Sequence, residues 1–205
     1  MRIKDVNPIA WINELTDLSD SLTDFAEEIT LFAQQLGISV EDYQADHIAV
    51  RCNSVATADR WRNGFLRFAD LLSEKQINGR PICLFSLHEP LQIGPWRIDC
   101  IELPYPSNKH YAREGWEHVE LVVPSSAQTI PELEQAIQEV LPSLTAVMAD
   151  PTAHGVRYKA SSPQAEDEQL ANPTLAFSRE HLTLKIHPLS IRAVIENKKT
   201  SFVTN

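Results

Sequence analysis

The sequence is short of glycine and of positive charge, and each shortage excludes a class of function. Its six glycines are spread singly, so no glycine-rich loop is present to cradle a phosphate. Lys and Arg total 18 against 28 Asp and Glu, which gives a formal charge of −10. Binding to nucleic acid or to an anionic membrane surface relies on clustered Lys and Arg. We therefore expect neither nucleic acid nor a membrane as a partner.

Long hydrophobic runs and paired cysteines are also missing. No stretch approaches 18 apolar residues, and the first residues, MRIKDVNPIAW, lack the apolar core of a signal peptide. Cys52, Cys83 and Cys100 are odd in number and fall in strand-like runs, which favours buried free thiols in a reducing compartment. These features predict a cytoplasmic protein. With 205 residues, 43% of them hydrophobic, the chain can bury a substantial core.

Hydrophobic spacing predicts an α+β protein that opens with helices. Over residues 8–37, apolar side chains recur every three or four positions, and Gly37 is a natural end signal, so we expect one or two amphipathic helices there. We divide the chain into an N-terminal helical extension (1–43), a core domain (44–190) and a C-terminal helix and tail (191–205).

Within the core domain, one order of elements occurs twice. We predict strands at 46–52, 80–87, 96–103, 117–123, 155–161, 174–178 and 182–188, and helices at 57–74, 130–144 and 189–197. A helix follows the first strand in both halves, and the opening strands are alike, DHIAV (46–50) against EHVEL (117–121). The order therefore indicates an internal repeat. The polar connection 161–173 is either a mobile lid or a plain surface loop.

Two histidines and a carboxylate hold prominent places in this repeat. His47 lies on the first predicted strand of the first half and Glu102 on its last, and His118 lies on the first strand of the second half. If the halves are related by a pseudo-two-fold axis, these side chains converge from separate strands into one cup. Two imidazoles and a carboxylate suit a divalent ion such as Fe(II), Mn(II), Ni(II) or Zn(II). The structural alternative is a hydrogen-bonded polar cluster without an ion.

The order β-α-β-β-β twice, with histidine on each first strand and a carboxylate on the last, resembles the vicinal oxygen chelate superfamily. That superfamily includes glyoxalase I, extradiol dioxygenases and bleomycin-resistance proteins. More narrowly, the segments ADHIAVRC, LLSEKQINGRPICLFSLHEP, EGWEHVELVVP, SSPQAEDEQLANPTLA and LKIHPLSI are similar to the YecM-like family over nearly the whole chain. The resemblance implies two βαβββ modules that form a curved mixed sheet around a central cup.

The resemblance also implies roles for single residues. His47, Glu102 and His118 match three metal ligands of the superfamily, whereas the fourth position, usually glutamate, falls on Lys185. A protonated ammonium cannot ligate a metal, so Lys185 is instead a candidate for substrate binding or for an ion pair with Glu102. Glu120 and His187 share the cup face and are candidates for a general base or a further ligand.

Arg51 is the last candidate residue. It shares the strand face of His47 and can orient a substrate carboxylate, with a surface salt bridge as the alternative. Two functions follow from these residues. The first is a metal-dependent isomerase, lyase or oxygenase that acts on a small oxygenated molecule. The second is a non-catalytic, metal-free protein that binds a small molecule in the same cup, and the oligomeric state is left open.

Overall fold

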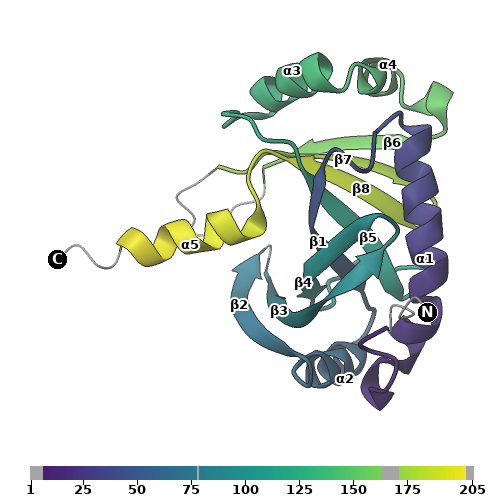
Figure 1. The fold of residues 1–205 in the computed structure, drawn as a ribbon, viewed down its shortest axis with the longest axis vertical. Helices are drawn as coiled ribbons and strands as arrows, with labels where there is room; N and C mark the ends of the chain where they lie inside the picture. Colours follow the sequence, from purple (N-terminus) through teal and green to yellow (C-terminus); the bar gives the residue numbers. More distant parts are fainter. Residues whose placement is uncertain (1–6, 78, 163–170, 202–205) are drawn as a thin grey trace, which may run out of the picture.

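A single eight-stranded sheet forms the centre of the protein in the computed structural model, which describes residues 7–77, 79–162 and 171–201 (Figure 1). The strands lie in the order β2-β3-β4-β1-β5-β8-β7-β6. Their bounds are β1 Gln44–Arg51, β2 Ala69–Ile77, β3 Arg80–Ile93, β4 Trp96–Pro104, β5 Gly115–Val122, β6 Arg157–Ser161, β7 Thr174–Arg179 and β8 Leu182–His187.

Strand directions divide this sheet into two equivalent halves. The central strands β1 and β5 are antiparallel, and each has a parallel neighbour on its outer side, β4 beside β1 and β8 beside β5. The outer pairs are all antiparallel. We call β1 to β4 with α2 the first module and β5 to β8 with α3 the second module. The predicted fold, two βαβββ modules in a curved mixed sheet, is confirmed.

Strand register makes the equivalence of the modules specific to single residues. Ala49 on β1 pairs with Glu102 on β4, and Glu120 on β5 pairs with Lys185 on β8. The preceding residues of each strand pair in the same way. Since His47 lies two residues before Ala49 and His118 two before Glu120, the two histidines occupy corresponding positions. Glu102 and Lys185 correspond likewise.

The helices among the described residues are short except for α1, which ends at a clear sequence signal. They are η1 Asn13–Leu15, α1 Thr16–Gln35, α2 Val55–Phe65, α3 Ile130–Val140, α4 Ser143–Ala149, η2 Thr152–His154 and α5 Ile191–Ser201. At the end of α1, Gly37 has φ 75°, and the amides of Gly37 and Ile38 donate to the carbonyls of Gln34 and Ala33. This is a Schellman cap, which glycine favours because it has no Cβ.

Helices α1, α2 and α3 cover one face of the sheet. Helix α1 contacts β3, β5 and β8, α2 contacts β4, and α3 contacts β7, and Figure 1 shows α1 running across the sheet. The strand residues on this face, such as Ile48, Phe85, Val119 and Phe177, are fully buried. Because side chains alternate along a strand, the polar residues of β1, β4 and β5 point to the other face. On that face α5 packs Ile195 in a small apolar cluster with Leu84 and Cys100.

One predicted helix is wrong over half of its length. We predicted a helix at 57–74, whereas α2 ends at Phe65 and residues 69–77 form β2, which pairs along its length with β3. Trp61, Phe65, Phe68 and Leu72 have the spacing of a helical stripe, and all four are at least partly buried. Pairing with β3 overrides this local pattern, as tertiary context often does.

Other predicted boundaries shift by smaller amounts. The segment 8–37 becomes η1 and α1, and the predicted helix 130–144 ends at Val140 and gives way to α4 around Pro142. Cys52, Cys83 and Cys100 are buried and free, as predicted. Of the helices among the described residues, not one has the length and apolarity needed to cross a membrane. Residues 163–170 of the predicted lid lie outside the described residues.

Candidate metal centre

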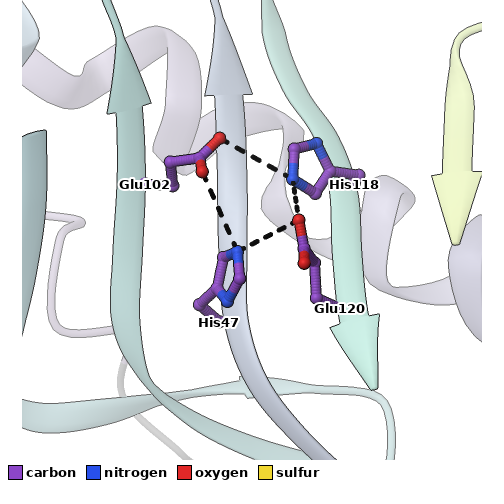
Figure 2. Close-up of side chains that lie close together, drawn as sticks. All are labelled: His47, Glu102, His118 and Glu120. Carbon is purple, nitrogen blue, oxygen red and sulfur yellow. Dashed lines mark ion pairs between the residues drawn. The ribbon is translucent and has the colours of Figure 1, made fainter. Parts of the chain in front are cut away.

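Four side chains from three neighbouring strands converge on the face of the sheet opposite α1, α2 and α3, which we call the open face. Figure 2 shows Glu102 reaching from β4, His47 from β1, and His118 and Glu120 from β5. His47 Nε2 lies 3.2 Å from Glu120 Oε1 and 4.0 Å from Glu102 Oε2. His118 Nε2 lies 3.1 Å from Glu120 Oε1 and 3.8 Å from Glu102 Oε1. The four donor atoms lie within 4.8 Å of one another.

These separations fit a shared cation. Donor atoms bound at about 2.1 Å to one ion lie roughly 3.0–3.5 Å apart in tetrahedral or octahedral geometry. His47 Nε2 is also buried, and although Glu120 Oε1 lies 3.2 Å away, within the part of the chain that the structure describes this nitrogen makes no hydrogen bond of regular geometry. A buried polar atom without a partner is costly, and a metal ion at this point would provide one. We conclude that His47, Glu102, His118 and Glu120 fit a divalent ion.

The cluster has strong electrostatic coupling. Burial disfavours the charged form of His47, but the carboxylates of Glu120 and Asp46 outweigh it and hold the His47 pKa well above its usual range. Burial likewise opposes ionisation of Glu120, but Lys185 and His47 keep its pKa well below the ordinary value. Arg51 and Lys185 lower the pKa of Glu102 against the same opposing effect of burial. Both carboxylates are therefore ionised and available as ligands at neutral pH.

Lys185 lies directly against this cluster. Its Nζ donates to Glu120 Oε1 at 2.6 Å and lies 3.0 Å from His118 Nε2. The ion pair expected with Glu102 is therefore made with Glu120 instead. The resemblance predicts a glutamate as fourth ligand on the last strand of the second module, and the Lys185 ammonium lies at that position. The cluster's other carboxylate, besides Glu102, comes from Glu120 on the neighbouring strand β5.

Arg51 and His187 flank the cluster rather than complete it. Arg51 donates to Glu102 Oε1 at 3.2 Å, and its other terminal nitrogen lies 3.6 Å from Glu117 Oε2. His187 is buried, 3.4 Å from Glu120 Oε2 and 3.2 Å from Asp46 Oδ1. The structure thus brings all seven predicted site residues together, but Arg51 is already paired with protein carboxylates.

Two acidic residues of the site were not predicted. Asp46 Oδ1 lies 2.9 Å from His47 Nδ1, and Glu117 Oε2 lies 2.5 Å from His118 Nδ1. The sequence carries a signal for both, since each histidine directly follows an acidic residue. Asp46, His47 and His187 also form a second group with donor atoms close together, but it shares His47 with the first group.

Access to the cluster comes from the side of Glu102, Lys185 and Glu117, whose side chains are 15%, 22% and 22% exposed. Both histidines are buried beneath them. A groove of about 1130 Å³ between α1 and the turn that joins β3 to β4 lies elsewhere, and none of the four candidate ligands lines it. A ligand of the cluster would therefore approach from the open face of the sheet.

Comparisons with known proteins place this architecture in one family. The family model described as YecM protein matches residues 14–198. Protein YecM of Escherichia coli is 40% identical over 192 residues, which cover 93% of this chain and 97% of that protein. An uncharacterized protein of Haemophilus influenzae is 34% identical over 191 residues, covering 90% of this chain and 95% of the relative.

A solved structure agrees with the sequence relatives. The structural-genomics protein EC4020 is 39% identical, has a TM-score of 0.77, and matches over 93% of this chain and 96% of its own. The match of the family model includes both modules and helix α1, and each of the two relatives aligns over at least 90% of the chain. This chain therefore belongs to the YecM family.

Proposed function

We propose that this protein binds a divalent metal ion through His47, Glu102, His118 and Glu120 and uses it in the chemistry of a small oxygenated molecule. The observation that carries the proposal is the convergence of four ionisable donors, one of which, His47 Nε2, is buried and makes no hydrogen bond of regular geometry among the described residues. Two imidazoles and two carboxylates suit Fe, Mn, Ni or Zn.

The proposed chemistry requires that a small molecule can reach the ion from the exposed side of the cluster. A bound divalent ion supplies Lewis acidity toward an oxygen of the ligand, which is compatible with isomerase, lyase and oxygenase reactions. Lys185 lies at the exposed edge of the cluster. When a cation takes over Glu120, the Lys185 ammonium can instead hold an anionic oxygen of the bound small molecule. Arg51 keeps Glu102 in place through their ion pair.

Glu120 and His187 receive different roles in this proposal. Glu120 closes the ligand set, because its Oε1 lies within 3.2 Å of the Nε2 atoms of both histidines. His187 lies behind Glu120 with 1% of its surface exposed. Its burial favours supporting Glu120 and Asp46 over direct contact with a ligand as a base.

Metal analysis of single variants tests the proposal. Protein purified without chelator should contain or take up close to one equivalent of Fe(II), Mn(II), Ni(II) or Zn(II), and His47→Ala and His118→Ala should each lose it. His88→Ala is the matched control, because His88 is 56% exposed and pairs with Asp70 away from the cluster. Circular dichroism of the metal-free variants verifies that they fold. Full metal content in either ligand variant would refute this ligand set.

A second candidate function is a metal-free protein that binds a small anionic molecule. The observation that favours it is the ammonium of Lys185, which lies within 3.0 Å of Glu120 and His118 and so supplies a positive charge without an ion. A parent protein that fails to take up any of the four metals would favour this function.

A further inference from the structure

The carboxylates of Asp46 and Glu117 stand in the same relation to the two candidate metal ligands. Each directly precedes a histidine and lies within hydrogen-bond distance of its Nδ1 atom, 2.9 Å for Asp46 with His47 and 2.5 Å for Glu117 with His118. In both rings the Nε2 atom is then the one that faces Glu102 and Glu120.

Neighbouring residues of a regular strand point to opposite faces, so these contacts need an interruption of the strands. The register between β1 and β5 shifts at two places. One shift lies between Ala45 and His47 and leaves Asp46 without a partner, and the other lies opposite Glu117, between the pairs Ala49–His118 and Val50–Trp116. A bulge re-aims a side chain and is common beside functional sites. The sheet therefore carries one bulge in each module, at corresponding positions.

Each carboxylate is also held through its second oxygen. Asp46 Oδ2 accepts the backbone N–H of Ile191, the first residue of α5. Glu117 Oε1 accepts the hydroxyl of Thr183 on β8 at 2.9 Å, and Thr183 Oγ1 lies 2.9 Å from Ser178 Oγ. Two anchors restrict the position of each carboxylate, and with it the orientation of each ring.

We propose that Asp46 and Glu117 are positioning residues for the metal centre. Each fixes the proton of its histidine on Nδ1, so that Nε2 presents a lone pair to the ion, and each makes that imidazole a stronger donor. The inference rests on the proposed metal function. It extends the site from four residues to six and explains why acidic residues precede both histidines.

Both residues also have a structural interpretation as partners in buried ion pairs. Asp46 contacts His187 as well as His47, and Arg51 lies near Glu117. Burial opposes ionisation of both carboxylates, but the adjacent histidines lower the pKa of each below its usual range. A purely structural role would affect folding stability without a specific effect on metal affinity, and this difference is what an experiment must measure.

The experiment compares metal affinities of amide variants with a matched control. Zn(II) or Co(II) affinity is measured by competition with a chromophoric chelator for the parent, Asp46→Asn, Glu117→Gln and Asp70→Asn. Asp70 is 82% exposed and forms an Asp–His pair with His88 outside the cluster. Loss of an outer carboxylate typically weakens metal affinity on the order of 10- to 100-fold. We expect such losses in the first two variants and none in Asp70→Asn.

Thr183→Val provides a variant that leaves all carboxylates in place. It removes the hydroxyl that holds Glu117 while nearly preserving side-chain volume, so we expect a smaller loss of affinity than in Glu117→Gln. In the Co(II) protein, the two Nδ1 protons should give two solvent-exchangeable, paramagnetically shifted proton resonances. Asp46→Asn and Glu117→Gln should each shift or lose one of them, whereas a role in stability alone would leave both unchanged.

The outcomes separate the two proposals. If the parent takes up none of Fe(II), Mn(II), Ni(II) and Zn(II), the proposed function fails. If the parent binds metal and Asp46→Asn, Glu117→Gln and Asp70→Asn all match it in affinity, the metal site stands and the positioning role is overturned. Should Asp46→Asn fold poorly because the N-terminus of α5 loses its acceptor, Glu117→Gln and Thr183→Val still decide the question.

Discussion

The first and second modules share one frame and differ where their last strands approach the central pair. At corresponding positions in the register, the first module carries Ala49 beside Glu102 and the second carries Glu120 beside Lys185. A strictly symmetric centre would have a carboxylate on both β4 and β8. Here the second carboxylate lies one strand further in, on β5, and a lysine occupies its expected place. The cluster thus has the two carboxylates of a symmetric centre, but one of them lies on a different strand.

The open faces of the modules also differ in what covers them. On the first module, Ile195 of α5 packs with Leu84 and Cys100, and Arg192 pairs with Asp99 at 2.9 Å. On the second module, β6 presents Arg157 and Lys159 as exposed residues. Among the described residues, the open face of the second module therefore adds two exposed cationic side chains that have no helix packed on them.

Substitution of the equivalent core phenylalanines tests the shared frame and should have the largest effect. Phe85 pairs with Ile101 and Phe177 with Leu184, so the two rings correspond, and both are fully buried. Phe85→Ala and Phe177→Ala should each reduce the free energy of unfolding by about 3–5 kcal/mol, because each leaves a large cavity. Urea unfolding followed by circular dichroism measures this loss.

Phe68→Ala is the control for these two variants. Phe68 is only partly buried and precedes β2, so its loss should cost clearly less. Because both modules contribute to one continuous core, each variant should shift a single unfolding transition. Two separate transitions, or a silent Phe177→Ala, would show that the modules do not fold as one unit.

Much of this frame could be predicted from the sequence, because alternation along strands is a local property. The likeness of DHIAV to EHVEL was enough to place His47 and His118 at corresponding positions. The register of β4 with β1 then places Glu102 beside Ala49, which pairs with His118 on its other side. Strand β2 could not be found this way. Its residues continue the helical spacing of α2, and only pairing with β3 makes them a strand.

The two bulges explain why Asp46 and Glu117 escaped prediction. The alternation rule places each on the face opposite its histidine, whereas an extra residue in the strand turns it back toward the ring. Bulges depend on the partner strand, so a single strand sequence carries no direct sign of them. Similarly, Lys185 was placed beside Glu102 by the symmetry of the repeat, but its nearest carboxylate is Glu120.

Substitution of Lys185 tests the asymmetry between the modules. In the absence of a cation its ammonium neutralises Glu120, so a metal ion must compete with it. Lys185→Met should therefore tighten metal binding roughly tenfold or more, since a like charge near the ion is removed. Isothermal titration with Mn(II) or Zn(II) measures the change.

Lys185→Glu sharpens this test because it gives both modules a carboxylate at the corresponding position. Without an ion, the new carboxylate faces Glu120 and should lower the thermal midpoint below that of Lys185→Met. Saturating metal should raise the midpoint of Lys185→Glu more than that of the parent, since the ion binds the folded state. If Lys185→Met loses stability and gains no affinity for metal, the metal-free function is favoured.

The smallest expected losses of unfolding free energy come from the two side chains of α1 that pair with one module each. Asp17, in the first turn of α1, accepts from Arg60 at 2.8 Å and from Trp61 Nε1 at 3.1 Å, both on α2 of the first module. Further along α1, Glu28 pairs with His181 near β8 of the second module, where both side chains are substantially exposed. Asp17→Asn should cost about 1 kcal/mol, and Glu28→Gln about 0.5 kcal/mol or less.

The pH dependence of Asp17→Asn identifies the charge as the cause. Burial opposes ionisation of Asp17, but Arg60 and Trp61 lower its pKa below the usual 3.8. The ionised carboxylate therefore stabilises the fold fully above that value, and its contribution is lost as pH falls through the lower pKa of the folded state. Urea unfolding at pH 7 and near pH 3 should show the difference from the parent shrinking. A difference that persists unchanged in acid would assign the effect to packing of Asp17 rather than to its charge.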